Sequence, residues 1–126
     1  MSNEVLKMDK VNPIEKLNKI KEYWKPKIVG ELNESYIKLT KLKGEFVWHY
    51  HDQEDEFFLV IKGNLLIKLR DRDATLREGE FIIIPKGEEH KPVANEEVSV
   101  MLIEPKSTVN TGNIKDERTL EKSDWI

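Results

Sequence analysis

Residues 44–63 read GEFVWHYHDQEDEFFLVIKG, and residues 79–95 read GEFIIIPKGEEHKPVAN. These stretches hold all three histidines of the 126-residue chain: His49, His51 and His90. His49 and His51 lie two positions apart in an extended run with Val47, so strand alternation places their side chains on one inward face. Two buried imidazoles need partners for their ring nitrogens, and a shared metal ion would provide one. A His-x-His pair alone is more often exposed or hydrogen-bonded than metal-binding.

The acidic residue Glu56 extends this pattern. Glu56, Phe58 and Val60 alternate along the next apolar run, so a carboxylate falls in line with buried side chains. A buried carboxylate also needs a partner, which a cation would supply. His90 follows the turn at residues 85–87 and starts another expected strand. Two hairpins would therefore bring three nitrogens and one oxygen to one end of a barrel.

The chain around these stretches is a series of short β-type runs separated by turn signals. Many short strands about ten residues apart indicate an all-β sandwich or barrel. Asn12 and Pro13 predict a helix start before them, with Ile14, Leu17, Ile20 and Tyr23 as its apolar stripe and an end before Pro26. The expected strands are 27–32, 36–43, 46–51, 56–61, 65–70, 74–77, 81–84, 90–93 and 98–104.

The two quoted stretches resemble the two sequence motifs of the cupin superfamily. The first motif requires His-x-His, four residues, Glu, six residues and Gly. The second requires Gly, five residues, Pro-x-Gly, two residues and His. The sequence departs from the usual spacing only at the outer turn residues Gly44 and Asn95. The matching residues are His49, His51, Glu56 and Gly63 in the first motif, and Gly79, Pro85, Gly87 and His90 in the second.

This resemblance implies a small single-domain cupin: a double-stranded β-helix (jelly-roll) barrel, here with a short N-terminal helix. It also implies that His49, His51, Glu56 and His90 hold one divalent metal ion per chain. Imidazole and carboxylate ligands suit Fe, Mn, Ni, Co, Cu or Zn. Glu56 would serve as a ligand or, if it swings free, as a general base.

The alternation of the predicted strands also suggests which residues line the pocket and which face outward. Phe57, Leu59 and Ile61 would form an apolar outer face, which needs a cover from the helix or from a second subunit. We therefore expect a homodimer. The expected pocket-lining residues are Phe46, Val47, Phe58, Val60 and, depending on strand register, Phe81 or Ile83.

Three function classes fit this pattern. The first is a metal-dependent enzyme, either a dioxygenase or a relative of the sugar-phosphate isomerases, acting on a small oxygen-rich molecule. The second is a module that binds a sugar or organic acid without turnover. The third is a structural or sensory domain whose metal stabilises the fold. The absence of an obvious basic cluster for a phosphate disfavours the isomerase.

Composition narrows the remaining choices. The chain has no cysteine, so thiolate ligands are excluded, and its net charge of −3 with mixed signs argues against a nucleic-acid binder. Apolar runs are too short for a membrane span, and no leader pattern precedes the helix, so we expect a cytoplasmic protein. The expected organisation is a flexible segment at 1–12, a barrel with its helix at 13–105 and an extension at 106–126.

Overall fold

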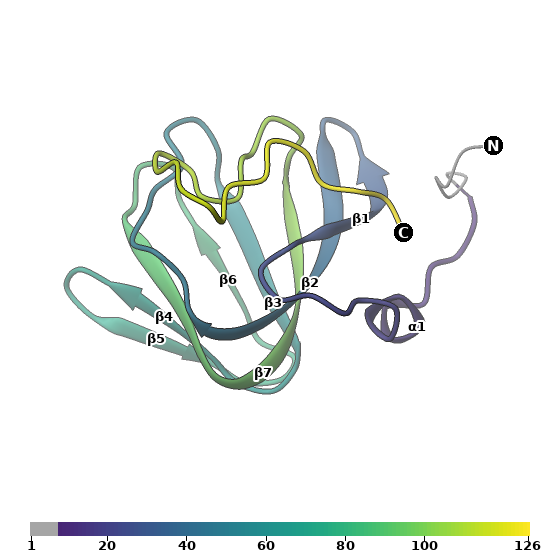
Figure 1. Ribbon diagram of the computed structural model, residues 1–126, viewed down its shortest axis with the longest axis horizontal. Helices are drawn as coiled ribbons and strands as arrows, with labels where there is room; N and C mark the ends of the chain where they lie inside the picture. Colours follow the sequence, from purple (N-terminus) through teal and green to yellow (C-terminus); the bar gives the residue numbers. More distant parts are fainter. Residues whose placement is uncertain (1–7) are drawn as a thin grey trace.

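The structure, a computed structural model, describes residues 8–126 (Figure 1). The N-terminal segment expected to be flexible therefore lies mostly outside the described residues. One short helix precedes seven strands. Their bounds are α1 (Pro13–Leu17), β1 (Lys27–Leu32), β2 (Ser35–Glu45), β3 (Glu56–Lys62), β4 (Leu65–Leu69), β5 (Asp73–Leu76), β6 (Phe81–Ile84) and β7 (His90–Pro105).

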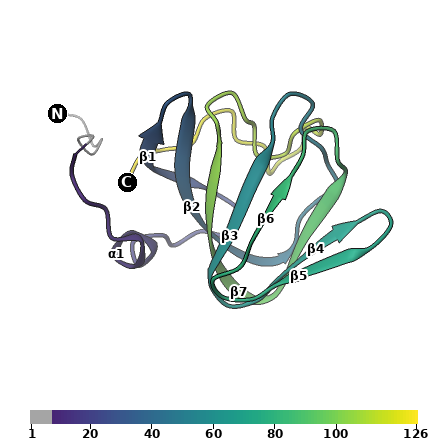
Figure 2. The ribbon, with the colours of Figure 1, turned by 180° about the vertical axis from the view of Figure 1, so that it is seen from behind.

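The strands are all antiparallel and curl around one interior. Strand β7 pairs with β2, β3 and β4, while β1 extends the sheet beyond β2 and β6 extends it beyond β3. Figure 2 shows these strands from behind, with the hairpin of β4 and β5 projecting at one side. The expected all-β cupin barrel with a short N-terminal helix is confirmed.

Side-chain alternation explains why these runs form strands. In β3 and β4 every second side chain is buried, as expected for strands with one face on a core. Each Å² of apolar surface withdrawn from water stabilises the folded state by about 25 cal/mol. Burial of this face therefore drives the folding of the barrel. The core includes Leu42, Phe58, Val60, Leu65, Ile67, Leu76, Ile84, Val98, Val100 and Leu102.

Two of the strand predictions were wrong. Residues 46–51 form no strand, because the sheet register shifts between Leu42 and Gly44 and β2 ends at Glu45. Beyond β2 the chain keeps a few isolated backbone contacts with β7. Phe46 N–H donates to the Pro92 carbonyl at 3.0 Å, and His49 and His90 exchange N–H donations at 3.0 and 2.9 Å. The runs 90–93 and 98–104 belong to one strand, β7. Residues 95–97, expected to form a turn, are instead the extra residues of β7 at the register shift opposite Leu42 and Gly44.

The helix starts as predicted and ends early. The Asn12 side chain caps it by accepting from the N–H groups of Ile14 and Glu15, and Pro13 takes the first position. The helix ends at Leu17 instead of continuing toward Pro26. Leu17 and Ile20 still pack on the outer face of the sheet, against a cluster that Ile61 joins. The helical segment therefore covers part of the predicted apolar face.

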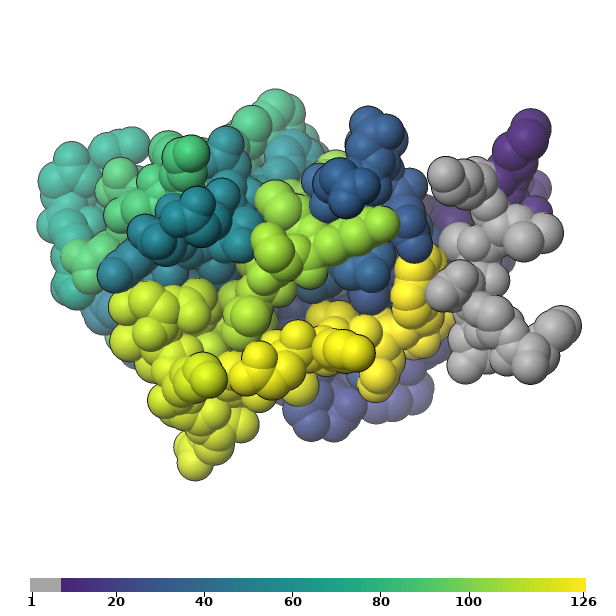
Figure 3. All heavy atoms as spheres, turned by 90° about the horizontal axis from the view of Figure 1, so that it is seen from above, coloured from purple at the N-terminus to yellow at the C-terminus, as the bar shows by residue number. Residues whose placement is uncertain are grey.

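Residues 106–126 form no helix or strand and cross one end of the barrel (Figure 3). Their last residues pair with β1, where Ile28 N–H donates to Asp124 and Ile126 N–H donates to Ile28. Earlier in the segment, Asn113 N–H donates to the carbonyl of Tyr50, between the two motif histidines. The segment is thus attached both to the sheet and to the loop that carries His49 and His51. No helix among the described residues is long and apolar enough to cross a membrane.

Gly112 packs against the loop that carries His49 and His51, with no room for a side chain. We expect Gly112→Ala to destabilise the protein by about 2 kcal/mol. Its φ of +55° disfavours a side chain, and a Cβ would overlap the Tyr50 carbonyl and press on the His49 ring. The matched control is Gly79→Ala, because Gly79 also has positive φ but faces open space. Urea unfolding measures both variants, and equal losses would contradict the close approach.

Candidate metal centre

Three segments meet at the motif histidines. His49 and His51 lie on the loop that follows β2, Glu56 starts β3, and His90 starts β7. All four side chains are buried, and each offers one ligand atom within 4.8 Å of the others. The structure therefore brings together the four residues that the sequence singled out. This buried cluster suits a metal ion.

Backbone contacts orient two of the rings. The Nδ1 atoms of His49 and His90 lie 2.9 Å from the carbonyl oxygens of Val47 and Glu88. A carbonyl oxygen only accepts, so each Nδ1 carries the proton and a neutral ring keeps its lone pair on Nε2. In metal sites, a group that hydrogen-bonds to the outer nitrogen of a ligating histidine commonly fixes its tautomer in this way.

The inward-facing atoms of the cluster lack satisfactory partners. Glu56 Oε1 lies 3.3 Å from both His51 Nε2 and His90 Nε2. None of these three buried atoms makes a hydrogen bond of acceptable geometry. Leaving buried polar atoms unpaired costs about 1–3 kcal/mol each, so a fold that gathers three of them needs a compensating ligand. The chemistry of the donor set fits a divalent cation.

The electrostatics of the cluster are strongly coupled. Burial opposes the charge on Glu56, but the adjacent His51 and His90 rings outweigh it and hold the pKa of this carboxyl below its usual value. Burial, followed by the nearby His90, lowers the pKa of His49 from 6.5 to about 4. Burial also opposes the charge on His51, but the contact with Glu56 outweighs burial and raises the pKa of this ring above its usual value. Near neutral pH the site therefore offers an ionised carboxylate and at least one neutral imidazole.

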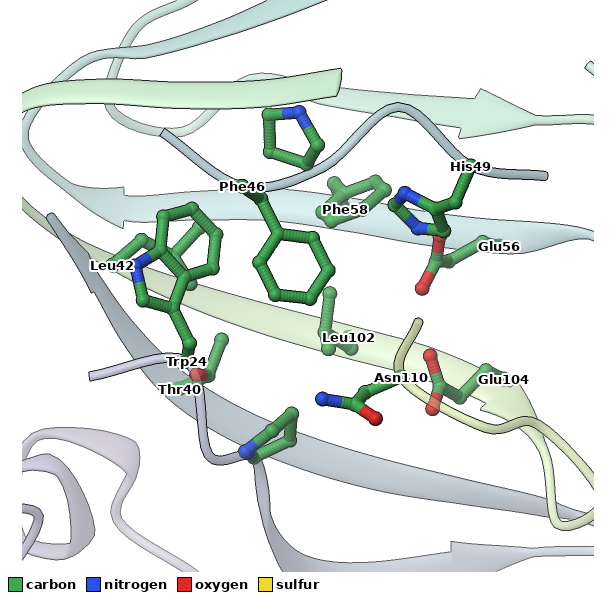
Figure 4. A pocket seen from close by; sticks show the side chains of 12 residues that line it. Trp24, Thr40, Leu42, Phe46, His49, Glu56, Phe58, Leu102, Glu104 and Asn110 are labelled. Carbon is green, nitrogen blue, oxygen red and sulfur yellow. The ribbon is translucent and has the colours of Figure 1, made fainter. Parts of the chain in front are cut away.

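A small cavity of about 40 Å³ adjoins the cluster, and its wall is mostly apolar (Figure 4). Phe46 and Phe58 line it as predicted, next to His49 and Glu56. The indole of Trp24 stacks on Phe46 with ring centroids 4.7 Å apart. The remaining lining residues are Pro26, Thr40, Leu42, Pro92, Leu102, Glu104 and Asn110.

Four other predicted lining residues lie elsewhere. Val47 is half-buried on the loop and Val60 is buried in the core, and neither reaches the cavity. Phe81 and Ile83 are 60% and 55% exposed, and Ile83 lines a separate, more open hollow that Glu56 and Glu104 also border. The register explains the last two: they pair with Leu59 and Phe57 and so share the outer face, whereas Ile82 and Ile84 pair with Phe58 and Glu56.

The sequence reasoning missed Glu104. This carboxylate is 3% exposed, lines the cavity and receives a 2.9 Å hydrogen bond from Lys38 Nζ on β2. Burial and then the charge of Glu56 raise its pKa, against the opposing effect of Lys38. The signal was available, because Glu104 continues the buried alternation of Val98, Val100 and Leu102, as Glu56 does with Phe58 and Val60.

Comparison with known proteins establishes the family. The model of the cupin domain matches residues 38–104, which contain every residue of the cluster. The chain therefore belongs to the cupin family.

Solved structures agree with this assignment. A cupin-2 domain protein from Shewanella frigidimarina is 46% identical, with a TM-score of 0.74 over 75% of this chain and 93% of its own. A protein from Neisseria meningitidis is 33% identical, with a TM-score of 0.71 over 77% of this chain and 99% of its own.

Among curated relatives, the uncharacterized protein YdbB from Bacillus subtilis is 36% identical over 75 residues, which is 66% of its length. A 3-hydroxyanthranilate 3,4-dioxygenase from Brucella anthropi is 38% identical over 64 residues. The match covers 44% of this chain but only 35% of the dioxygenase. The likeness to the enzyme is therefore limited to a part of its length.

Proposed function

We propose that this cupin binds one divalent metal ion per chain through His49, His51, Glu56 and His90, and uses it to bind and transform a small organic molecule. The observation that carries the proposal is the set of buried, unpaired ligand atoms on Glu56, His51 and His90. A hydrogen-bonded polar core would have satisfied these atoms within the protein.

When bound, the metal would act as a Lewis acid or provide a site where dioxygen and substrate bind together. The protein's residues do the rest. Val47 and Glu88 hold two imidazoles in the ligating tautomer, and Phe46, Phe58 and Leu102 keep bulk water from the adjoining cavity. The lowered pKa of Glu56 favours a role as ligand over a role as general base.

Among metal-dependent reactions, oxygenation is the best supported, because curated relatives with matching segments are named dioxygenases. A sugar-phosphate isomerase is less well supported, since no lysine or arginine of residues 8–126 lines this cavity, while Lys86 lines a separate, more open hollow that Glu56 and Glu104 also border. The Fe(II) form should consume dioxygen when supplied with a catechol or a β-diketone. Saturable binding of these compounds without oxygen uptake would favour a binding module.

Metal content tests the centre itself. Protein purified without an affinity tag, or reloaded with Fe(II), Mn(II), Ni(II) or Zn(II), should hold about one ion per chain. His51→Ala should lose most of it, because the remaining donors are too few for tight binding. The matched control is Glu54→Gln, which alters a nearby acid that bonds to Ser107 instead of joining the cluster. Absence of metal from every wild-type preparation would overturn the proposal.

We also propose that the protein is a homodimer. Phe81 and Ile83 project from strand β6, at the edge of the sheet, and the Phe57 ring lies 5.0 Å from that of Phe81. The helical segment covers Ile61 but leaves this exposed pair uncovered. Sedimentation equilibrium should give twice the chain mass at micromolar concentration, and Phe81→Lys should give the mass of one chain. A monomeric wild type would refute the dimer.

A further inference from the structure

Glu104 Oε1 is a buried acceptor with no hydrogen-bond partner. The other carboxylate oxygen, Oε2, is taken by Lys38, whose Nζ approaches it to 2.9 Å. Glu104 comes from β7 and lines the same cavity as Glu56 and His49, as Figure 4 shows. An acceptor left open inside a cavity is completed when a bound molecule donates a hydrogen bond to it.

The wall around Glu104 restricts the charge of that molecule. Among residues 8–126, the cavity lining contains aromatic, aliphatic and neutral polar groups and the carboxyls of Glu56 and Glu104, but no cation. Lys38 is paired with Glu104, and Lys86 lines a separate, more open hollow that Glu56 and Glu104 also border. An anionic group that did not contact a metal would thus be desolvated against an apolar wall, which is strongly unfavourable.

The size of the cavity restricts the molecule further. A volume of about 40 Å³ corresponds to roughly three water positions, so the cavity suits a ligand of only a few non-hydrogen atoms. Asn110 already donates to Arg118 and accepts from Leu120, so it keeps only one N–H and one lone pair for a ligand. Glu104 Oε1 and Thr40 Oγ1 are buried lining atoms with no partner, and of these two residues only Glu104 carries a carboxylate, the stronger acceptor for a hydroxyl group.

We propose that Glu104 is the specificity-determining acceptor for a small uncharged ligand, such as a hydroxy ketone, whose hydroxyl donates to Oε1 while its oxygens reach the metal centre. The inference rests on the proposed metal centre and adds the substrate class to it. Lys38 acts as a positioning residue that holds Glu104 toward the cavity.

Calorimetric titration of the Zn(II)-loaded protein tests this with three probes of equal size. Hydroxyacetone carries the donor, butanone replaces the hydroxyl by a methyl group, and glycolate replaces the methyl group by a charged oxygen. We expect hydroxyacetone to bind about tenfold or more tightly than either analogue. In Lys38→Met/Glu104→Leu, which removes both charges together, the preference over butanone should fall about tenfold. The control Glu96→Gln changes an exposed acid of the same strand and should keep the preference.

Zinc content is measured on the same samples before any probe is added. A wild-type protein that takes up no zinc would overturn the proposed metal centre, and with it this inference. A stoichiometric zinc protein that binds glycolate as tightly as hydroxyacetone would overturn the inference alone. So would a double variant that binds zinc but retains the full preference for hydroxyacetone over butanone.

Discussion

Replacing Lys38 by methionine should destabilise the protein by about 3–5 kcal/mol at pH 9, because it removes the counter-charge of the buried Glu104 carboxyl. The loss should depend on pH. The pKa of Glu104 is already above its ordinary value, and removal of Lys38 raises it further, so the folded state holds a proton that the unfolded state releases. The free energy of unfolding of the variant should therefore fall as the pH rises above the ordinary carboxyl range. Urea unfolding at pH 5 and at pH 9 measures this fall.

Two further variants isolate the ion pair. Lys38→Met/Glu104→Leu should recover most of the stability, because replacing both members of a buried pair by apolar groups is often neutral or favourable. Lys43→Met changes an exposed lysine at the far end of the same strand and should stay within about 0.5 kcal/mol of wild type. If Lys38→Met behaves like Lys43→Met, the ion pair contributes nothing to stability.

The metal-free protein should lose about 3 kcal/mol of stability through His49 between pH 7 and pH 4. The folded protein keeps this ring neutral down to its lowered pKa of about 4, whereas the unfolded chain takes up the proton near 6.5. The unfolded state thus binds more protons across this window, so stability falls as the pH falls. Glu56 adds a loss of the same sign only at lower pH, while the raised pKa of His51 opposes both.

The difference between wild type and His49→Gln separates the contribution of His49 from those of its neighbours. Both proteins are stripped with a chelator and unfolded in urea at half-unit steps of pH. We expect the advantage of wild type over the variant to shrink as the pH falls from 7 to 4. An advantage that does not change with pH would show that the ring titrates normally in the folded state.

Much of the fold could be predicted because it follows from short-range patterns. Alternating burial and turn residues located β3 and β4, and the Asn12 cap located the start of the helix. The errors occurred where tertiary context decided. The register shift at Leu42–Gly44 ended β2 before the histidine loop, and no local property of residues 46–51 indicates this. The helix also ends at Leu17, well before Pro26, in a turn where the N–H groups of Lys19 and Ile20 donate to Lys16 and Leu17.

The candidate site shows the same division. Motif spacing identified His49, His51, Glu56 and His90, which the fold brings together from three segments. The cavity wall was predicted less well, since the side of the sheet that Phe81 occupies depends on the β3–β6 register. Trp24 and Asn110 come from irregular segments and have no periodic signal at all. Glu104 had such a signal, and the same alternation argument used for Glu56 would have found it.

Strand β7 has a consequence for how the chain is made. It pairs with β2, β3 and β4, all of which leave the ribosome before it, and it carries His90 at its first position. Until β7 emerges, these three strands expose unpaired edges, which favour association with other chains. The proposed metal centre also lacks His90 at that stage, so the four-residue cluster is completed only when β7 is made. We therefore expect assembly of the barrel during synthesis to depend on prompt arrival of this one segment, and nascent chains that stop before residue 90 to aggregate.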